Sequence, residues 1–337
     1  MPLTVPGEWA PHAAMWLGFP SHEELWEDDL APAQAEVAAL ARALAGPGGE
    51  RVRLLVQGDE AEAAARALLA GARVEIVRGL FGDIWLRDTG PIFTLNQNGV
   101  AAAAFRFNGW GGKYVLEGDD GVAEQLAAAS GAPLTGHEMV LEGGALDHDG
   151  FGTVLTTRQC LLNANRNPGW DVAVAEAALK SALGAKKVLW LGDGLLNDHT
   201  DGHVDNLARF VAPGVVACPV SFGRDDPNGA LYDETAALLA SMTDARGAPL
   251  QVMRVASPGF IDAGKGEPSP ASHMNFIIAN SAVIAPIYEE RAGGFALDAL
   301  AGLFPEREVI GLPSRAILTG GGSFHCITQQ EPAIPPL

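Results

Sequence analysis

The sequence predicts an α/β fold assembled from similar units, and three observations support this prediction. Short β-rich runs alternate with alanine-rich helical stretches along almost the whole chain. Four segments rich in polar chemistry recur along it, at 83–91, 142–152, 197–206 and 320–330. Their spacing is regular: 54 positions separate Asp88 from Glu142, 61 separate Glu142 from His203, and 123, about twice 61, separate His203 from Cys326. We therefore expect β-α units of about sixty residues around an axis, each contributing one loop to a shared centre.

Individual elements follow from the hydrophobic pattern and from the turn residues. Strands are expected at 51–57, 73–78, 187–191 and 250–255. Helices are expected at 60–70, 171–183 and 231–242. A further apolar run, Ala316 to Leu318, is strand-like. Pro and Gly clusters at 46–49 and 264–270 predict turns or surface loops rather than an interdomain linker, so we expect residues 1–337 to form a single domain.

Charge and cysteine content narrow the class of protein. The 22 Lys and Arg residues against 41 Asp and Glu residues give a net charge of -19, which repels nucleic acid and anionic membranes and attracts cationic solutes.

The cysteines Cys160, Cys218 and Cys326 are far apart, which favours neither a disulfide framework nor a thiolate zinc site. The N-terminal residues lack the pattern of a secretion signal, and no apolar run reaches membrane-spanning length. We expect a cytoplasmic protein that binds a small cation but neither nucleic acid nor a membrane, with a homodimer as an open possibility.

Cys326 is the predicted nucleophile. It lies in the segment from Gly320 to Thr328, where three consecutive glycines would let the backbone approach a ligand closely. A cysteine thiolate is a strong nucleophile at neutral pH and a reasonable leaving group later in a reaction. Taken alone, the segment fits an inert core cysteine equally well.

The polar run from Asn197 to Asn206 is rich in titratable groups. If residues 202–207 are extended, His203 and Asp205 lie on one face and can point into one pocket, where an imidazole beside a carboxylate suits proton transfer. Two alternatives stay open: a metal site made of His199, His203 and Asp205, and an exposed polar loop.

The segment from Asp83 to Pro91 combines acids, an aromatic residue and an arginine. Two carboxylates that flank a planar guanidinium can each accept parallel N–H bonds, and Asp88 and Asp205 could supply them. Trp85 could cover an alkyl chain or a cation, or be a core aromatic. Arg87 is predicted to hold neighbouring acids in place.

Glu142 follows an apolar run and precedes three small residues. A carboxylate at such a place could accept a hydrogen bond from an imidazole, fix its tautomer and raise its basicity, as the third member of a Cys/His/Glu set. Capping of a loop is the alternative.

Together these segments resemble the agmatine deiminase family, within the guanidino-group-modifying enzymes that include bacterial peptidylarginine deiminases. The resemblance spans nearly the whole chain and extends to three further motifs, Glu8 to His12, Phe107 to Tyr114 and Asn275 to Asn280. It implies a five-bladed α/β propeller of pseudo-fivefold symmetry, the pentein fold, with the active site on the central axis and with no metal or cofactor. Departures at Ser323, commonly Asn in the family, and at His273-Met274 concern recognition of the far end of the substrate.

The resemblance also implies a reaction and a set of residues. By motif match, the catalytic residues fall on Cys326, His203 and Glu142, and the substrate-binding residues on Asp88, Asp205 and Trp85. The implied reaction converts agmatine and water to N-carbamoylputrescine and ammonia through a covalent cysteine thiouronium, in putrescine biosynthesis. The alternatives are the same chemistry on free or peptidyl arginine, a metallohydrolase, and a non-catalytic polyamine-binding protein.

Overall fold

The strands of this chain form five small sheets in the computed structural model, which describes residues 2–264 and 266–334. The one four-stranded sheet has the order β16 (Thr328–Pro332), β1 (His12–Gly18), β2 (Val52–Val56) and β3 (Val74–Arg78). The other sheets are β4 (Ile92–Asn96) with β5 (Gly99–Arg106) and β6 (Leu134–Val140), β7 (Asp147–His148) with β8 (Thr153–Thr157) and β9 (Lys187–Leu191), β10 (Arg209–Ala212) with β11 (Val215–Val220) and β12 (Gln251–Ala256), and β13 (Ile277–Ile278) with β14 (Ala282–Ile287) and β15 (Glu308–Pro313).

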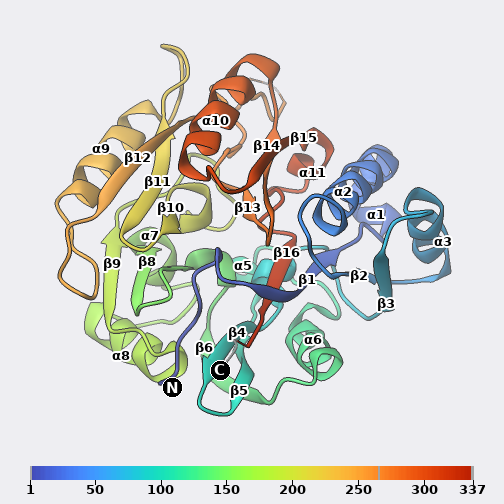
Figure 1. The fold of residues 1–337 in the computed structure, drawn as a ribbon, viewed down its shortest axis with the longest axis horizontal. Helices are drawn as coiled ribbons and strands as arrows, with labels where there is room; N and C mark the ends of the chain where they lie inside the picture. Colours follow the sequence, from blue (N-terminus) through green and yellow to red (C-terminus); the bar gives the residue numbers. More distant parts are fainter. Residues whose placement is uncertain (1, 265, 335–337) are drawn as a thin grey trace.

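All five sheets repeat one pattern. An antiparallel pair of strands is followed by a helical crossover to a parallel strand, as in β10, β11 and β12. The first strands of the units begin at residues 92, 147, 209, 277 and 328, a spacing near sixty. The fifth unit joins the two ends of the chain, because β16 pairs antiparallel with β1 and β1 runs parallel to β2. Figure 1 shows the five units arranged around a common centre, which confirms the predicted propeller.

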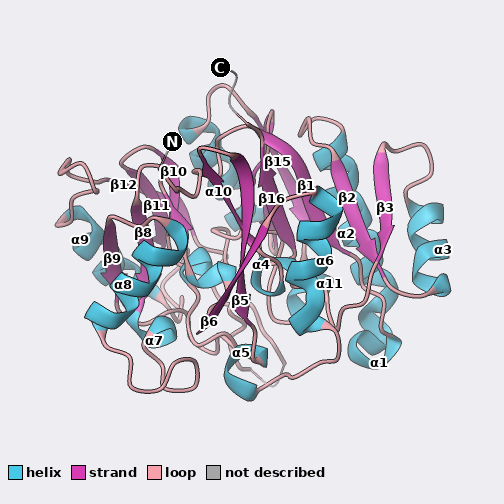
Figure 2. Ribbon diagram, turned by 90° about the horizontal axis from the view of Figure 1, so that it is seen from below, coloured by secondary structure: helices cyan, strands magenta, loops and turns pink. Residues whose placement is uncertain are grey.

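Helices connect the parallel strands and form short turns near the centre. The longer ones are α2 (Leu30–Ala45), α3 (Asp59–Leu68), α6 (Val122–Ser130), α8 (Val172–Leu183), α9 (Gly229–Ala240) and α10 (Glu290–Leu303). The short ones are α1 (Glu23–Trp26), α4 (Leu86–Thr89), α5 (Gly109–Gly112), α7 (Arg158–Leu161) and α11 (Arg315–Thr319). In Figure 2, α1, α5 and α7 lie on the side of the molecule opposite the two termini.

The local sequence explains α8 well. Asp171 caps it by accepting a hydrogen bond from the Val174 amide, and Gly184 ends it with a left-handed φ of 73°. Its buried residues are Ala175, Leu179, Ala182 and Leu183, a spacing that places them on one helical face. In the described part of the chain, no helix combines the length and the apolar character that crossing a bilayer requires.

The predicted strands and helices are confirmed with ends that differ by at most two residues, but two segments were predicted wrongly. Ala316 to Leu318 belong to helix α11 rather than to a strand. Glu36, on α2, accepts hydrogen bonds from the first backbone amides of this helix, those of Arg315, Ala316 and Ile317. Residues 202–207 are not extended either, because Val204–Asn206 form a 3-10 turn, η4.

Candidate active site

A cavity of about 260 Å³ lies among the loops next to α1 and α5. Its lining comes from segments far apart in the sequence: Leu25, Asp83, Trp85, Asp88, Trp110, Tyr114, Leu116, His199, Thr200, Asn206, Thr319, Gly320, Gly321, Gly322 and Cys326. Three of the four polar segments predicted to meet therefore do so here. The fourth supplies Glu142, which contacts the cavity residues through His203.

Cys326 lies just beyond the glycine loop that follows α11. The side-chain amide of Asn275 donates a hydrogen bond to Sγ at 3.1 Å, and the thiol donates to Oδ2 of Asp205 at 3.6 Å. Burial, followed by the negative charges of Asp205 and Asp88, raises the pKa of the Cys326 thiol well above its usual value. In the free protein at neutral pH, this cysteine is therefore a protonated thiol.

Gly144, in the 3-10 turn η3 (Gly143–Ala145), marks the point where three polar groups converge. A methyl group at this glycine would lie 2.6 Å from Nδ1 of His203, 2.9 Å from Oδ1 of Asp88 and 3.1 Å from Oδ2 of Asp205. A side chain at this position would therefore collide with His203 and Asp88 and crowd Asp205. Because Gly144 has no side chain, an imidazole and two carboxylates surround a single small space.

Hydrogen-bond donors outside this space fix the carboxylates of Asp88 and Asp205. Asp88, on α4, accepts hydrogen bonds from the indole of Trp110 at 2.9 Å and from the Gly144 amide at 2.9 Å. Asp205, in η4, accepts one from His325 at 2.8 Å, while its Oδ1 has no partner among the described residues. Burial raises the pKa of Asp88, whereas the hydrogen bond and charge of His325 outweigh burial and lower the pKa of Asp205. Asp205 is therefore an anion with an oxygen available to a cationic ligand.

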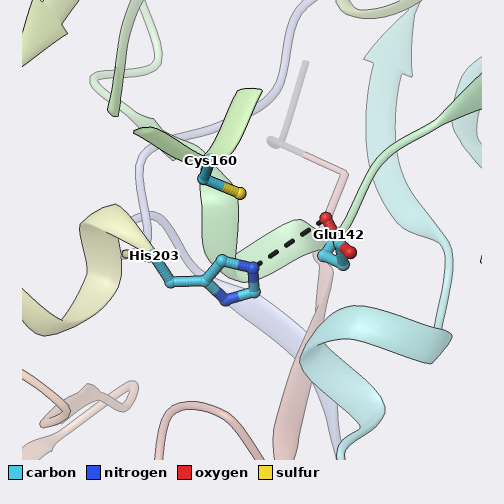
Figure 3. Close-up of side chains that lie close together, drawn as sticks. All are labelled: Glu142, Cys160 and His203. Carbon is cyan, nitrogen blue, oxygen red and sulfur yellow. Dashed lines mark ion pairs between the residues drawn. The ribbon is translucent and has the colours of Figure 1, made fainter. Parts of the chain in front are cut away.

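His203 is fully buried between two carboxylates. Its Nδ1 lies 3.7 Å from Oδ1 of Asp88, and its Nε2 lies 3.9 Å from Oε2 of Glu142, the pair joined by the dashed line in Figure 3. Burial alone would lower the pKa of this imidazole, but the charge of Asp88 and contacts with Cys160 and Glu142 raise it well above its usual value. At neutral pH His203 is thus an imidazolium, the protonated form that can act as a general acid.

Glu142 is fixed by a buried arginine. Nε of Arg166 donates to Oε1 of Glu142 at 2.7 Å, and both side chains are almost completely buried. Burial alone would raise the pKa of Glu142, but the contacts with His203 and Arg166 lower it. The second oxygen of this carboxylate is the one that faces His203.

Trp85 forms one wall of the cavity, and its position explains the glycine loop. A side chain at Gly320 or Gly322 would come within 2.7 Å or 2.6 Å of the Trp85 ring. All three glycines of the loop line the cavity, and two of them also pack closely against this indole. Asp83 orients the ring, since it accepts a hydrogen bond from the Trp85 indole at 2.8 Å and another from Trp26 at 3.0 Å.

Replacing Asp83 with asparagine should therefore loosen Trp85. In the variant, an NH₂ group replaces one carboxylate oxygen, and this group cannot accept a hydrogen bond from an indole. The loss of a hydrogen bond to a charged group costs about 1.5–3 kcal/mol. We expect the free energy of unfolding in denaturant to fall by about 2 kcal/mol and the KM to rise more than kcat falls. Trp26→Phe is the matched control, because it removes one indole donor and leaves the bond between Asp83 and Trp85. An unchanged KM in Asp83→Asn would show that Trp85 does not depend on Asp83.

Two expectations about individual residues are corrected. Arg87 was expected to hold neighbouring acids, but its guanidinium donates to the side chain of Gln329 at 2.9 Å and to the carbonyl oxygen of His325 at 3.3 Å. Arg87 therefore holds in place the residues on both sides of Cys326. Ser323 and His273 were expected to concern recognition of the far end of the substrate, but neither lines the cavity. The Ser323 side chain bonds to Ser314, and the His273 ring bonds to the Ala256 carbonyl.

The alternative metal site of His199, His203 and Asp205 is not assembled. Within the described residues, the only three His, Cys, Asp or Glu side chains that bring possible ligand atoms within 4.8 Å of one another are Glu142, Cys160 and His203. His199 instead stacks on Tyr114 at the cavity wall, with ring centroids 5.8 Å apart.

Four residues of the site received no role from the sequence. Asn275 and Trp110 lie in motifs that carry the family resemblance, but no pattern connected them with Cys326 or Asp88. Asp83 and Gly144 act through contacts with residues distant in the chain, which only the folded structure shows.

The chain is similar to known proteins along almost its whole length. Residues 4–332 match the family described as Porphyromonas-type peptidyl-arginine deiminase. An agmatine deiminase of Stutzerimonas stutzeri is 39% identical over an alignment 353 positions long, which covers 98% of this chain and 95% of that protein. A solved agmatine deiminase of Enterococcus faecalis superposes with a TM-score of 0.91 at 32% identity, covering 98% of this chain and 96% of that one. A Porphyromonas gingivalis chain provisionally named an arginine deiminase gives a TM-score of 0.88 at 32% identity, covering 98% of both chains.

Proposed function

The chain belongs to the Porphyromonas-type peptidyl-arginine deiminase family, and from this premise we propose that it hydrolyses agmatine to N-carbamoylputrescine and ammonia. The agmatine deiminase resemblance predicted from the motifs is confirmed by the relatives. One observation carries the proposal further: a buried thiol, an imidazolium and two carboxylates surround one small space. This arrangement suits a planar guanidinium, which needs acids at its edges and a nucleophile at its central carbon.

The first half of the reaction forms a covalent intermediate. Asp88 and Asp205 accept N–H bonds from the guanidinium and hold its carbon near Sγ of Cys326. The Cys326 thiol loses its proton to solvent when the cation binds. The thiolate then adds to this carbon, His203 donates a proton to the departing nitrogen, and the C–N bond breaks to release ammonia. A thiouronium on Cys326 remains, and His203 is left as a neutral imidazole.

The second half returns the enzyme to its starting state. Neutral His203 takes a proton from water, and the resulting hydroxide adds to the thiouronium carbon. The C–S bond then breaks, the thiolate leaves, and the proton of the added hydroxyl passes to the thiolate, which restores the Cys326 thiol and gives the neutral ureido product. Glu142, held by Arg166, stabilises the imidazolium whenever His203 carries its second proton.

The cavity lining favours agmatine over arginine. No Lys or Arg lines the cavity among the described residues, whereas Asp83 and Asp88 do. Lys113 near the rim is already paired with Asp201 at 2.6 Å. A substrate that ends in an amine meets no repulsion here, but the carboxylate of free arginine would find no cationic partner.

A substrate panel tests the proposal directly. Ammonia release and ureido product are measured with agmatine, free arginine and an arginine-containing peptide. We expect kcat/KM for agmatine to exceed that for arginine by about 100-fold or more, because like-charge juxtaposition costs several kcal/mol. Equal turnover of arginine would overturn the assignment of the substrate but retain the chemistry. Binding of agmatine without release of ammonia would instead favour the polyamine-binding alternative.

Substrate should also ionise its own nucleophile. Because the charges of Asp205 and Asp88 help to raise the pKa of Cys326, a cation between them should lower it. We expect ultraviolet thiolate absorbance to appear at lower pH when a diamine of matching length, which lacks a guanidinium carbon, is bound. Cys326→Ser gives the background from the other cysteines. An unchanged titration with saturating diamine would contradict this substrate-assisted ionisation.

We also propose that the protein works in the cytoplasm as a single domain over residues 1–337 and contributes to putrescine biosynthesis. The three cysteines are free thiols, which supports a reducing compartment.

A further inference from the structure

Cys160 is a second buried thiol near the reaction centre, and the proposed reaction does not use it. It lies on α7, where Thr157 caps the helix by accepting a hydrogen bond from the Cys160 amide. Its Sγ, a ring nitrogen of His203 and a carboxylate oxygen of Glu142 all lie within 4.8 Å of one another. Figure 3 shows the three side chains grouped together. All three side chains are at most 1% exposed.

The three atoms form a ligand set that suits zinc. Thiolate, imidazole and carboxylate are the groups that zinc binds, and a tetrahedral zinc with bonds of about 2.0–2.3 Å holds its ligand atoms roughly 3.5 Å apart. Nε2 of His203 and Oε2 of Glu142 are already 3.9 Å apart, so a shift of a few tenths of an ångström suffices for this pair. Neither ring nitrogen of His203 has a hydrogen-bond partner among the residues described, so Nε2 is available to a metal.

The surroundings orient these ligands as metal sites require. The other oxygen of Glu142 accepts a hydrogen bond from Arg166 at 2.7 Å, which fixes the carboxylate. Nδ1 of His203 lies 3.7 Å from Oδ1 of Asp88, so that a small rotation makes the carboxylate–histidine contact that accompanies most metal-bound imidazoles. Asp88 also lines the cavity, so that His203 is separated from it by this one side chain.

We propose that Glu142, Cys160 and His203 form an inhibitory site for Zn²⁺. The ion displaces the thiol proton of Cys160 and the Nε2 proton of His203, and both protons pass to solvent. The carboxylate and the thiolate then balance its two positive charges. Bound zinc removes the imidazole from proton transfer, so it stops turnover without contacting Cys326. Binding itself is independent of the proposed function, and only the inhibition rests on it.

Cobalt substitution tests the binding. Co²⁺ bound to a thiolate gives a near-ultraviolet charge-transfer band that does not depend on enzyme activity. We expect this band in the wild type and in Cys326→Ser, and we expect its loss in Cys160→Ser. Cys218→Ser is the matched control and should keep the band, because its buried thiol lies in a different core cluster. Loss of the band in Cys326→Ser with its retention in Cys160→Ser would overturn the proposal. If Cys160→Ser does not fold, X-ray absorption of the zinc-loaded wild type decides: one sulfur at about 2.3 Å with lighter ligands supports the site, and none or two contradict it.

Inhibition is measured separately. Zn²⁺ should abolish ammonia release, a chelator should restore it, and Mg²⁺, which prefers oxygen ligands, should have no effect. In Cys160→Ser the zinc concentration for half-inhibition should rise by roughly 100-fold or more, because the loss of a ligand should cost at least as much as the 10- to 100-fold that follows loss of an outer partner. Equal zinc sensitivity of wild type and Cys160→Ser would refute the inhibitory site. If ammonia release is absent from the outset while the cobalt band is present, the proposed function fails and the metal site stands.

Discussion

Replacing Cys326 with alanine is expected to lower kcat by between roughly 10⁴- and 10⁶-fold, the range in which loss of a nucleophile falls. The thiol of Cys326 lies 3.6 Å from Asp205, beside the space where the guanidinium is proposed to bind. Without Sγ no covalent intermediate forms, and water would have to attack the guanidinium directly. Asp88, Asp205 and His203 remain in the variant, so agmatine should still bind.

The measurement pairs turnover with binding and with mass. Cys326→Ala should show substrate binding by calorimetry but no ammonia release, and Cys218→Ala, at a buried thiol outside the cavity, should retain the wild-type rate. Rapid quenching of the wild-type reaction should give a mass increase that maps to Cys326. Full turnover by Cys326→Ala, or an adduct on another residue, would exclude the covalent route.

Much of the architecture could be predicted because it is encoded locally. The alternation of strands and helices follows hydrophobic periodicity, and α8 has both of its end signals, Asp171 and Gly184, in sequence. The spacing of polar segments near sixty residues reflects the units of the propeller, since each unit brings one loop to the centre. Loops distant in the chain therefore meet, which is why the six residues singled out from the sequence lie in or next to one cavity.

The two wrong predictions have different physical causes: a contact between segments far apart in the chain for α11, and a local turn for the segment around Asp205. Ala316 to Leu318 are apolar enough for a strand, but the carboxylate of Glu36 accepts hydrogen bonds from the amides that begin α11. Around Asp205 the cause is local: the amides of Leu207 and Ala208 donate to the Val204 carbonyl, and this turn replaces the expected extended segment. His203 and Asp205 still face one space, but through a turn and not through strand alternation.

Replacing Asp205 with asparagine is the second change with a large expected effect. The carboxylate is fully buried and contacts both His325 and Cys326, and its free oxygen is proposed to bind the guanidinium. Truncating one partner of a buried charge pair costs about 2–5 kcal/mol, which corresponds to a loss in kcat/KM of roughly 30- to 4,000-fold. Steady-state kinetics with agmatine measures this loss. Asp193→Asn, which removes one exposed carboxylate outside the cavity, should leave kcat/KM unchanged.

The same variant should shift the nucleophile in the opposite direction. The negative charge of Asp205 helps to raise the pKa of Cys326, so its removal should lower that pKa in the free enzyme, and thiolate absorbance should appear at lower pH than in the wild type. Burial and Asp88 remain, so the pKa should stay above its ordinary value. Asp205→Asn would then hold a more readily ionised thiol and yet be a poorer enzyme. This combination arises only if Asp205 acts by holding the cation, because a carboxylate that served merely to adjust the thiol would give higher activity when removed.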